Sequence, residues 1–184
     1  MNQTKEDELD VGVLDFLTRA LDPLKPAPSL RERLMGLASG KERFMPFLDR
    51  MMSLFDLPQD AANGELHTID EADAWEDMVP GVRYRDFEGG PGIGEAHGGL
   101  VRVAPGASFP PHEHVGDEAM LMLQGEIEDD AGKRYSAGDL IESDSGSQHT
   151  LRNVGETEVI YAARVVAVNF LGDDDDDDDD VDLD

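Results

Sequence analysis

Short apolar segments separated by glycine-rich turns fill the chain after about residue 62, and they constrain its fold more than any other feature. Most of the 19 glycines lie between Gly64 and Gly155. The apolar segments between them are only a few residues long, which is typical of strands. The clearest of them are Leu100–Val103, Ala119–Leu123, Asp139–Ile141 and Val159–Val168. Short strands at this spacing predict an all-β sandwich or barrel.

The residues before this region have another pattern, because their apolar side chains recur at helical spacing. The pattern predicts three helices, at residues 7–21, from Ser29 to Gly40 and from Phe44 to Phe55. A proline-rich segment separates the first two, and a capping-box sequence opens the second. We therefore expect residues 1–62 to be an α-helical segment that packs against itself, the following domain or a second chain.

The chain is strongly acidic, with 42 acidic and 15 basic residues and a formal net charge of −27. Such a surface repels phosphate, so we expect no nucleic-acid partner. Residues 173–184 are nearly all aspartate, which predicts a disordered acidic tail. No apolar stretch reaches the ~18 residues of a membrane span. The polar, acidic first residues do not resemble a signal peptide, so we expect a cytoplasmic protein without membrane association.

The chain has no cysteine and only five histidines, so a metal site would need imidazole and carboxylate ligands. His112 and His114 are two residues apart in an expected strand, so both point to the same face. Glu118 can reach that face, and His149 would come from another strand. On its own, a His-x-His pair is more often unliganded. Three imidazoles and one carboxylate suit zinc, iron, manganese, nickel or copper better than calcium or magnesium.

Two spaced motifs around these residues closely resemble the paired motifs of the cupin superfamily. The first is Gly106-x5-His112-x-His114-x3-Glu118-x6-Gly125. The second is Gly138-x5-Asp144-x-Gly146-x2-His149-x3-Asn153, in which Asp144 stands where proline is usual. The resemblance implies a mainly β fold, a cupin jelly-roll (double-stranded β-helix) barrel over residues 63–172 that follows the short helical segment. It also implies one divalent transition metal inside the barrel, held by His112, His114, Glu118 and His149.

A closer likeness is to the cupin half of ChrR-type anti-sigma factors. It is carried by Leu54–Leu57, Trp75, Val79–Val82, Gly89–Pro91, Phe109–His114 and Leu123–Gly125. In that family the cupin binds zinc and responds to the signal, while an N-terminal helical domain holds the sigma factor and a second zinc through His-x-x-x-Cys-x-x-Cys. This chain lacks that motif, having no cysteine and no histidine before His67. The resemblance implies a ChrR-like cupin that binds zinc, with iron or manganese as alternatives and a sigma factor as a candidate partner.

Two main functions remain open for such a chain, beside a third in which the helices and the tail make it an interaction protein with a vestigial metal site. The ChrR likeness implies a regulatory or stress-sensing module that binds a metal without catalysis. The alternative is a metal-dependent cupin dioxygenase that acts on a small carbonyl or enol compound, because iron or manganese keeps coordination positions open for a small-molecule ligand. Tetrahedral zinc would be closed by the same four ligands, which favours sensing. The sequence names no catalytic residue.

The remaining histidines and the polar neighbours of the ligands are expected to have no part in the site. His67 and His97 lie outside both motifs, and we expect them on the surface or in loops. Glu113 and Gln148 adjoin the ligands, but adjacent strand residues point away from the barrel interior. Trp75 is expected to pack at the entry of the barrel.

Residues 118–123 are expected to form a strand with two apolar faces, and the segment from Val159 to Val168 is apolar on both faces apart from Arg164. Met120 and Met122 share the parity of Glu118 and should face the barrel interior, whereas Leu121 and Leu123 should face outward. A strand with two apolar faces must be buried on both sides by other parts of the protein or by a partner. The N-terminal helices can cover one side and a second subunit the other, so we expect a homodimer.

Overall fold

The computed structural model describes residues 40–172. The helices expected at residues 7–21 and from Ser29 onward lie outside the described residues, as does the acidic tail expected at residues 173–184. The chain divides into two compact units, Met1–Gly40 and Lys41–Asp184. All the helices and strands given below belong to the second unit.

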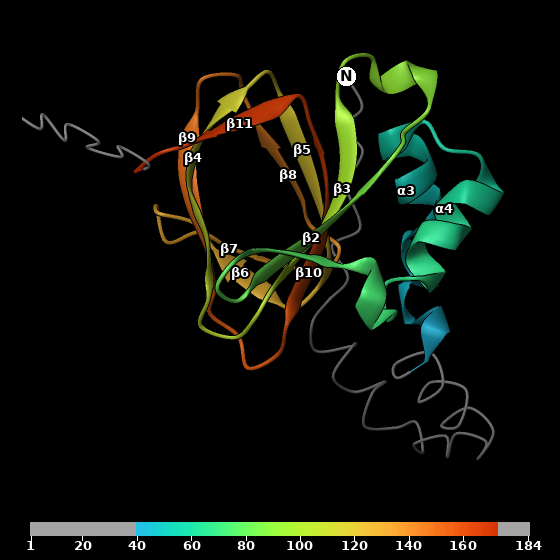
Figure 1. Cartoon of the computed structure of the whole chain (residues 1–184), viewed down its shortest axis with the longest axis horizontal. Coiled ribbons are helices and arrows are strands. Elements are labelled where there is room, and N and C mark those ends of the chain that lie inside the picture. Colours follow the sequence, from blue (N-terminus) through green and yellow to red (C-terminus); the bar gives the residue numbers. More distant parts are fainter. Residues whose placement is uncertain (1–39, 173–184) are drawn as a thin grey trace, which may run out of the picture. The chain divides into compact units, whose positions relative to one another are not determined.

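A layer of short helices comes first in the described range (Figure 1). Its elements are η1 (Lys41–Phe47), α3 (Leu48–Phe55), α4 (Gln59–His67) and η2 (Ala72–Ala74). The helix expected from Phe44 to Phe55 is confirmed, with its first turns in the tighter 3₁₀ form around Pro46. Helix α4 was not predicted, since its sequence has few apolar residues. It buries Ala62 and Leu66, which are one turn apart, so tertiary packing stabilises it. Within residues 40–172, every helix is too short or too polar to reach across a lipid bilayer.

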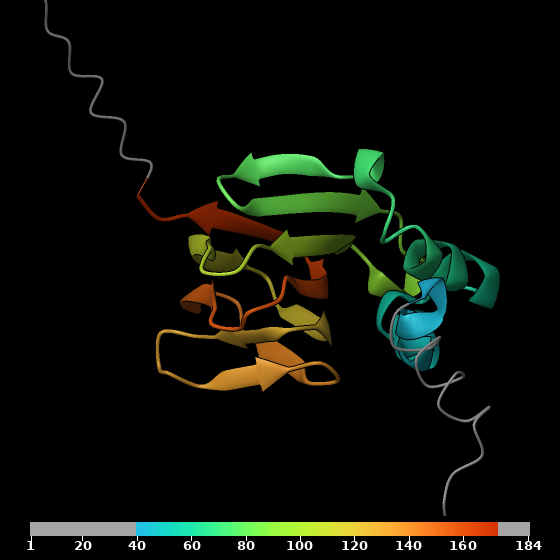
Figure 2. The same cartoon turned by 90° about the horizontal axis from the view of Figure 1, so that it is seen from below.

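Two antiparallel sheets form the rest of the described range (Figures 1 and 2). The six-stranded sheet has the order β1 (Glu76–Val79), β2 (Val82–Phe87), β3 (His97–Val103), β10 (Val159–Val165), β5 (Glu118–Gln124), β8 (Leu140–Ser143). The five-stranded sheet has the order β11 (Ala167–Phe170), β4 (Ser108–Val115), β9 (Gln148–Asn153), β6 (Glu126–Glu128), β7 (Arg134–Ser136). A short 3₁₀ turn, η3 (Pro91–Ile93), lies between β2 and β3. The expected mainly β class is confirmed. No strand pairing joins the two sheets among these residues, so they face each other as an open barrel.

The six-stranded sheet has a separate hydrophobic core on each face. The inner core lies between the sheets and includes Val101, Phe109, Met120, Met122, Ile127, Leu151 and Tyr161. The outer core lies between the sheet and the helices and includes Phe44, Met51, Phe55, Leu66, Trp75, Leu100, Leu121, Leu123 and Ile160. Each large side chain that is removed from water contributes about 1.5–3 kcal/mol. Figure 1 shows the helices on the outer side of this sheet.

The alternation predicted for β5 is confirmed. Met120 and Met122 belong to the inner core, and Leu121 and Leu123 belong to the outer core. The helices cover one face of β5 and the five-stranded sheet covers the other. Both apolar faces are therefore buried by other parts of this chain. The homodimer that we expected from those faces stays a prediction, without support from them.

Trp75 packs in the outer core, not at the barrel entry where the sequence placed it. Its side chain is buried, and its indole N–H donates a hydrogen bond of 3.0 Å to the carbonyl of Ile69. The Arg102 guanidinium lies 4.4 Å from the centre of the indole ring. This stack joins the outer surface of β3 to the helical layer.

A short contact ties the end of α3 to the loop between β2 and β3. Asp56 follows α3 in the left-handed conformation, with φ of 52°. The Gly90 N–H donates to the carbonyl of Phe55 at 2.8 Å, and the Gly92 N–H donates to the Asp56 carboxylate at 2.7 Å. A Cβ atom on Gly90 would lie 1.9 Å from the Asp56 carbonyl oxygen. Only glycine permits this close approach, and these hydrogen bonds fix the loop between β2 and β3 against the end of α3.

Candidate metal centre

Strand β4 directs its two histidines into the barrel because of a bulge. The register of β4 against β9 shifts between Phe109 and His112, at the Pro110-Pro111 pair. Proline has no N–H for the ladder, so a bulge is where two prolines fit. The extra residue lets Phe109 and His112 both face inward although they are three residues apart, and His114 follows on the same face. Both histidines are 1% exposed.

The other two residues of the predicted site come from different strands. His149 on β9 is the direct cross-strand partner of His112. Glu118 begins β5, in the opposite sheet, and is 8% exposed. Strands β4 and β5 are joined by a tight turn at Gly116, whose φ is 86°. The fold therefore brings all four predicted residues together at one place between the sheets.

The ligand atoms of His112, His114, Glu118 and His149 all lie within 4.8 Å of one another. The Nε2 atoms of His112 and His149 are 3.1 Å apart, and Nε2 of His114 is 3.1 Å from a carboxylate oxygen of Glu118. Two atoms that each lie about 2.1 Å from one metal are roughly 3.0–3.4 Å apart in octahedral or tetrahedral geometry. The cluster therefore has the size and the donor chemistry to bind one transition metal.

The second nitrogen of two of these imidazoles is already engaged. Nδ1 of His112 lies 2.8 Å from the carbonyl of Pro110, to which it can only donate. Nδ1 of His114 lies 3.0 Å from the hydroxyl of Ser147 and 3.1 Å from its carbonyl. With the protons on Nδ1, the Nε2 lone pairs of both rings face the centre of the cluster. The sequence did not point to Ser147 or to the carbonyl of Pro110, because no spacing rule covers such backbone contacts.

The turn before His149 is held without the proline that is usual at position 144. The Ser147 N–H donates to the carbonyl of Asp144 at 3.0 Å, and the Ser147 hydroxyl donates to the same carbonyl at 2.6 Å. The hydroxyl is thereby left to accept from His114. Asn153, the last residue of the second motif, is buried and donates to the carbonyls of Val103 and Thr157 at 2.8 and 2.9 Å. Its role in the structure is to fix the turn after β9.

The site favours neutral imidazoles at two of its three histidines. Burial lowers the pKa of His112, and burial with the adjacent His112 lowers the pKa of His149 to about 4. The hydrogen bond to Glu118 raises the pKa of His114. Protons therefore compete weakly with a metal at His112 and His149 near neutral pH.

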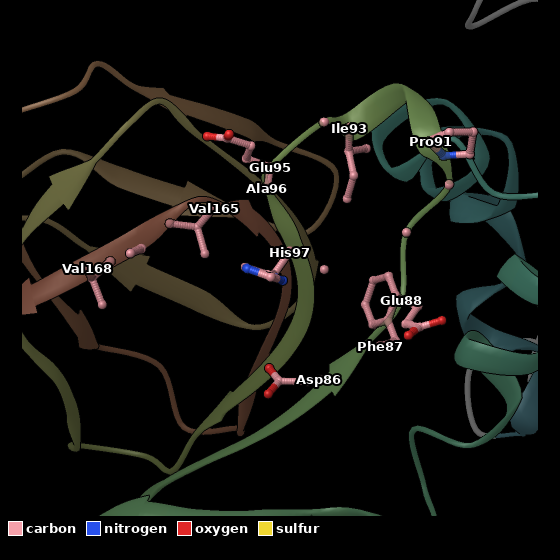
Figure 3. Close-up of a pocket in the computed structure, with 15 residues that line it drawn as sticks. Asp86, Phe87, Glu88, Pro91, Ile93, Glu95, Ala96, His97, Val165 and Val168 are labelled. Atoms are coloured by element: carbon pink, nitrogen blue, oxygen red, sulfur yellow. The ribbon is translucent and has the colours of Figure 1, made fainter.

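A cavity of about 130 Å³ lies beside the cluster. His112 and Glu118 form part of its wall, and most other wall residues are apolar, among them Val101, Phe109, Leu151, Tyr161, Ala163, Val165 and Val168. A larger open groove of about 800 Å³ shares Asp86, His97, Gly98, Val165 and Val168 with it. Figure 3 shows that groove, with Asp86, His97 and Val165 along its inner side. The groove therefore adjoins the cavity, and we refer to it as the entrance.

The other polar residues considered from the sequence lie where they were expected. Nδ1 of His67 lies 2.8 Å from the carbonyl of Asn63, within α4. His97 is exposed at the start of β3, although its place on the entrance was not foreseen. Gln148 donates to the Glu113 carboxylate at 2.6 Å on the exposed side of the sheet, away from the cluster.

The chain is similar to known proteins in sequence and fold. The family model described as the ChrR cupin-like domain matches residues 63–168. No curated protein matches the chain. Among solved structures, the complex of Rhodobacter sphaeroides SigE with the anti-sigma ChrR is similar at a TM-score of 0.50 and 24% identity, covering 84% of this chain and 75% of that chain. This likeness supports the jelly-roll fold.

Two further solved structures have weaker similarity. An acetylacetone dioxygenase from Acinetobacter johnsonii has a TM-score of 0.48 and 18% identity, covering 56% of this chain and 75% of that chain. An RmlC-like cupin protein from Ralstonia eutropha has a TM-score of 0.47 and 21% identity, covering 54% of this chain and 67% of that chain.

Proposed function

The chain belongs to the family of ChrR cupin-like domains, and from that premise we propose that it is a metal-binding regulatory module that responds to stress, related to anti-sigma factors. Its metal is bound by His112, His114, Glu118 and His149. The observation that carries this proposal is the convergence of four donor atoms within 4.8 Å, from three strands in two sheets. The lowered pKa values of His112 and His149 and the orientation of Nε2 in His112 and His114 also support it.

Zinc is the metal we propose first. Four protein ligands complete a tetrahedral zinc shell, which suits a structural or sensing site. Iron or manganese would keep one or two positions open. Which metal the site holds decides between the two functions considered below.

The metal site is tested by elemental analysis of full-length protein purified without added metal. We expect about one equivalent of zinc per chain, and a loss of most of it in His149→Ala. The matched control is His67→Ala, which removes an imidazole whose ring is bonded within α4. Wild-type protein without a stoichiometric transition metal would refute the proposal.

A sigma factor is the partner that the family relationship supports. The solved complex described above contains SigE together with the anti-sigma ChrR. In this chain residues 1–62, the proposed helical segment, would make the contact, and residues 63–172 would form the sensing cupin. The sigma factors of the source organism should be co-expressed one by one with the tagged, full-length chain. One of them should co-purify in equal amount, and co-purification of none would refute this part of the proposal.

A second function, that of a metal-dependent dioxygenase for a small carbonyl or enol compound, is favoured by one observation. The cavity of about 130 Å³ opens onto His112 and Glu118, so a small molecule can reach the metal position. In such an enzyme the metal would act as a Lewis acid on the bound substrate. Iron-loaded protein should then consume dioxygen with a panel of diketones and enols. A full zinc complement and no oxygen uptake by the iron form would exclude it.

A further inference from the structure

The cavity beside the metal cluster has a buried polar wall group, the hydroxyl of Tyr161, that no other residue of the described range engages. Tyr161 lies on β10, in the inner core, and is 2% exposed. Its side chain forms part of the cavity wall. Among residues 40–172, no hydrogen bond to its hydroxyl is found. The hydroxyl is not one of the fully buried polar atoms that lack a partner, so it reaches the open space of the cavity, where a bound molecule can accept its hydrogen bond.

A second tyrosine of the same cavity provides the contrast. Tyr84 on β2 also lies on the wall, but its hydroxyl donates to the Glu76 carboxylate at 2.9 Å on the exposed side. Tyr84 therefore contributes only its ring to the cavity. Burial, with the negative charge of Glu118 nearby, raises the pKa of Tyr161 well above that of a free tyrosine, so its hydroxyl remains a donor.

The entrance to the cavity is acidic. Asp86, Glu88 and Glu95 lie on the groove, and Asp86 also reaches the cavity wall. Figure 3 shows these three carboxylates at the groove. Within the part of the chain that the structure describes, neither the groove nor the cavity is lined by a lysine or an arginine. Three like charges in a lining without basic residues repel an anion on its way in.

We propose that the cavity binds a small, uncharged molecule that places one oxygen at the metal and accepts a hydrogen bond from Tyr161 with another. The wall between these two polar points is apolar, which suits a compact carbon skeleton. This inference rests on the metal site proposed above. It names the class of ligand, which is the same for a signal and a substrate, because zinc can expand its shell from four to five donors and iron or manganese keeps a position open.

The test uses full-length protein loaded with cobalt, whose visible spectrum reports a change in coordination. The probe is glycolamide, an uncharged molecule that carries a carbonyl and a hydroxyl oxygen. It is titrated into wild type, Tyr161→Phe and Tyr84→Phe. We expect Tyr161→Phe to bind it about 3- to 10-fold more weakly, which is the value of one hydrogen bond, and Tyr84→Phe to bind it as the wild type does.

Thermal unfolding of the metal-free proteins separates ligand binding from a structural role. Since the Tyr161 hydroxyl has no partner to lose among the described residues, Tyr161→Phe should unfold at the same temperature as the wild type or at a higher one. A clear drop in that temperature would mean that the hydroxyl is bonded within the protein, and would overturn the inference.

The charge of the ligand is tested with glycolate, an anion with as many non-hydrogen atoms as glycolamide. Wild-type protein should bind glycolate more weakly than the uncharged probe. The double variant Asp86→Asn/Glu95→Gln should bind glycolate about 3- to 10-fold more tightly and the uncharged probe equally well. Glu156→Gln is the control, because Glu156 lies on neither the groove nor the cavity.

Failure of this inference can be told from failure of the proposed function. Protein that binds no cobalt would refute the metal site, and the inference with it. Stoichiometric cobalt with equal probe affinity in wild type and Tyr161→Phe would refute only the role of Tyr161 and the ligand class. Tighter binding of glycolate than of the uncharged probe would also overturn the inference, and the metal site would stand.

Discussion

At the scale of single residues, the site depends on atoms that face away from its centre. Each imidazole has two nitrogens, and the one outside the cluster decides which way the lone pair of the other points. The Pro110 carbonyl fixes this for His112, and Ser147 fixes it for His114. A metal site is therefore built from its supporting contacts as much as from its ligands.

Replacing Ser147 by alanine should weaken zinc binding about 10-fold, since the His114 ring loses its hydroxyl partner and keeps only the Ser147 carbonyl. Competition with a chelator of known affinity measures the change. Ser136→Ala, which removes an exposed hydroxyl on β7, serves as the control. Equal affinity in both variants would mean that the carbonyl alone orients the ring.

The pKa of His149, about 4 in the folded protein against 6.5 for the free side chain, predicts a pH dependence of the metal-free protein. Between these values the unfolded chain binds more protons, so stability falls as the pH falls. The wild type should lose on the order of 2 kcal/mol more than His149→Gln between pH 7 and pH 4.5. Urea unfolding at both pH values measures this difference. Parallel losses in the two proteins would contradict it.

At the scale of elements, the helical layer is fastened to the sheet by polar contacts as well as by the outer core. Arg85 on β2 pairs with Glu65 of α4 at 2.8 Å, and Arg43 of η1 donates to the side-chain carbonyl of Gln124 on β5 at 3.3 Å. The end of α3 is tied to the loop that forms the entrance of the cavity. Helices that precede the cupin thus contact the edge of its ligand entrance.

The contact between Gly90 and Asp56 can be broken by a single methyl group. Gly90→Ala should destabilise the protein by about 1–3 kcal/mol, because the new Cβ would collide with the Asp56 carbonyl. Gly64→Ala is the matched control, because no atom lies within 4 Å of the Cβ position of Gly64 in α4. Alanine has a higher helix propensity than glycine, so this variant should be slightly more stable than the wild type. Urea unfolding followed by the fluorescence of Trp75, the single tryptophan, measures both. Equal stability of the two variants would show that the loop between β2 and β3 can move away from Asp56 at no cost in free energy.

Sequence patterns predicted the strands and the four clustered residues because both depend on local periodicity and fixed spacing. The alternation from Met120 to Leu123 needed only the two-residue period of a strand. Helix α4 was missed because its stability comes from the sheet that it covers. The bulge at Pro110-Pro111 and the contact between Ser147 and His114 depend on which strands are neighbours in the sheet. The sequence of a single segment does not show this pairing.

At the scale of the whole molecule, the cluster bridges two sheets that no strand pairing joins in the described range. Glu118 belongs to the six-stranded sheet, whereas the three histidines belong to the five-stranded one. A bound metal would connect the two halves of the open barrel. The proposed homodimer and the boundaries proposed for the helical segment, the cupin and the tail remain separate questions, which sedimentation and limited proteolysis of the full chain can answer.

Metal binding should therefore stabilise the whole barrel. At a free zinc concentration about 1,000 times the dissociation constant, the free energy of unfolding should rise by about 4 kcal/mol. Thermal unfolding with zinc and with a chelator measures this, and His112→Ala should abolish the difference. Equal shifts in wild type and variant would mean that zinc acts elsewhere on this acidic chain.

Strand β5 forms a wall of both cores and also carries Glu118 at its first position. Inserting or deleting one residue between Glu118 and Leu123 would exchange its two faces, bringing leucines into the barrel and turning methionines toward the helices. The same change would move the carboxylate out of step with the histidines. Relatives of this chain can therefore differ in the identity of the five residues from Ala119 to Leu123, but an alignment that opens a gap between Glu118 and Leu123 would be misplaced.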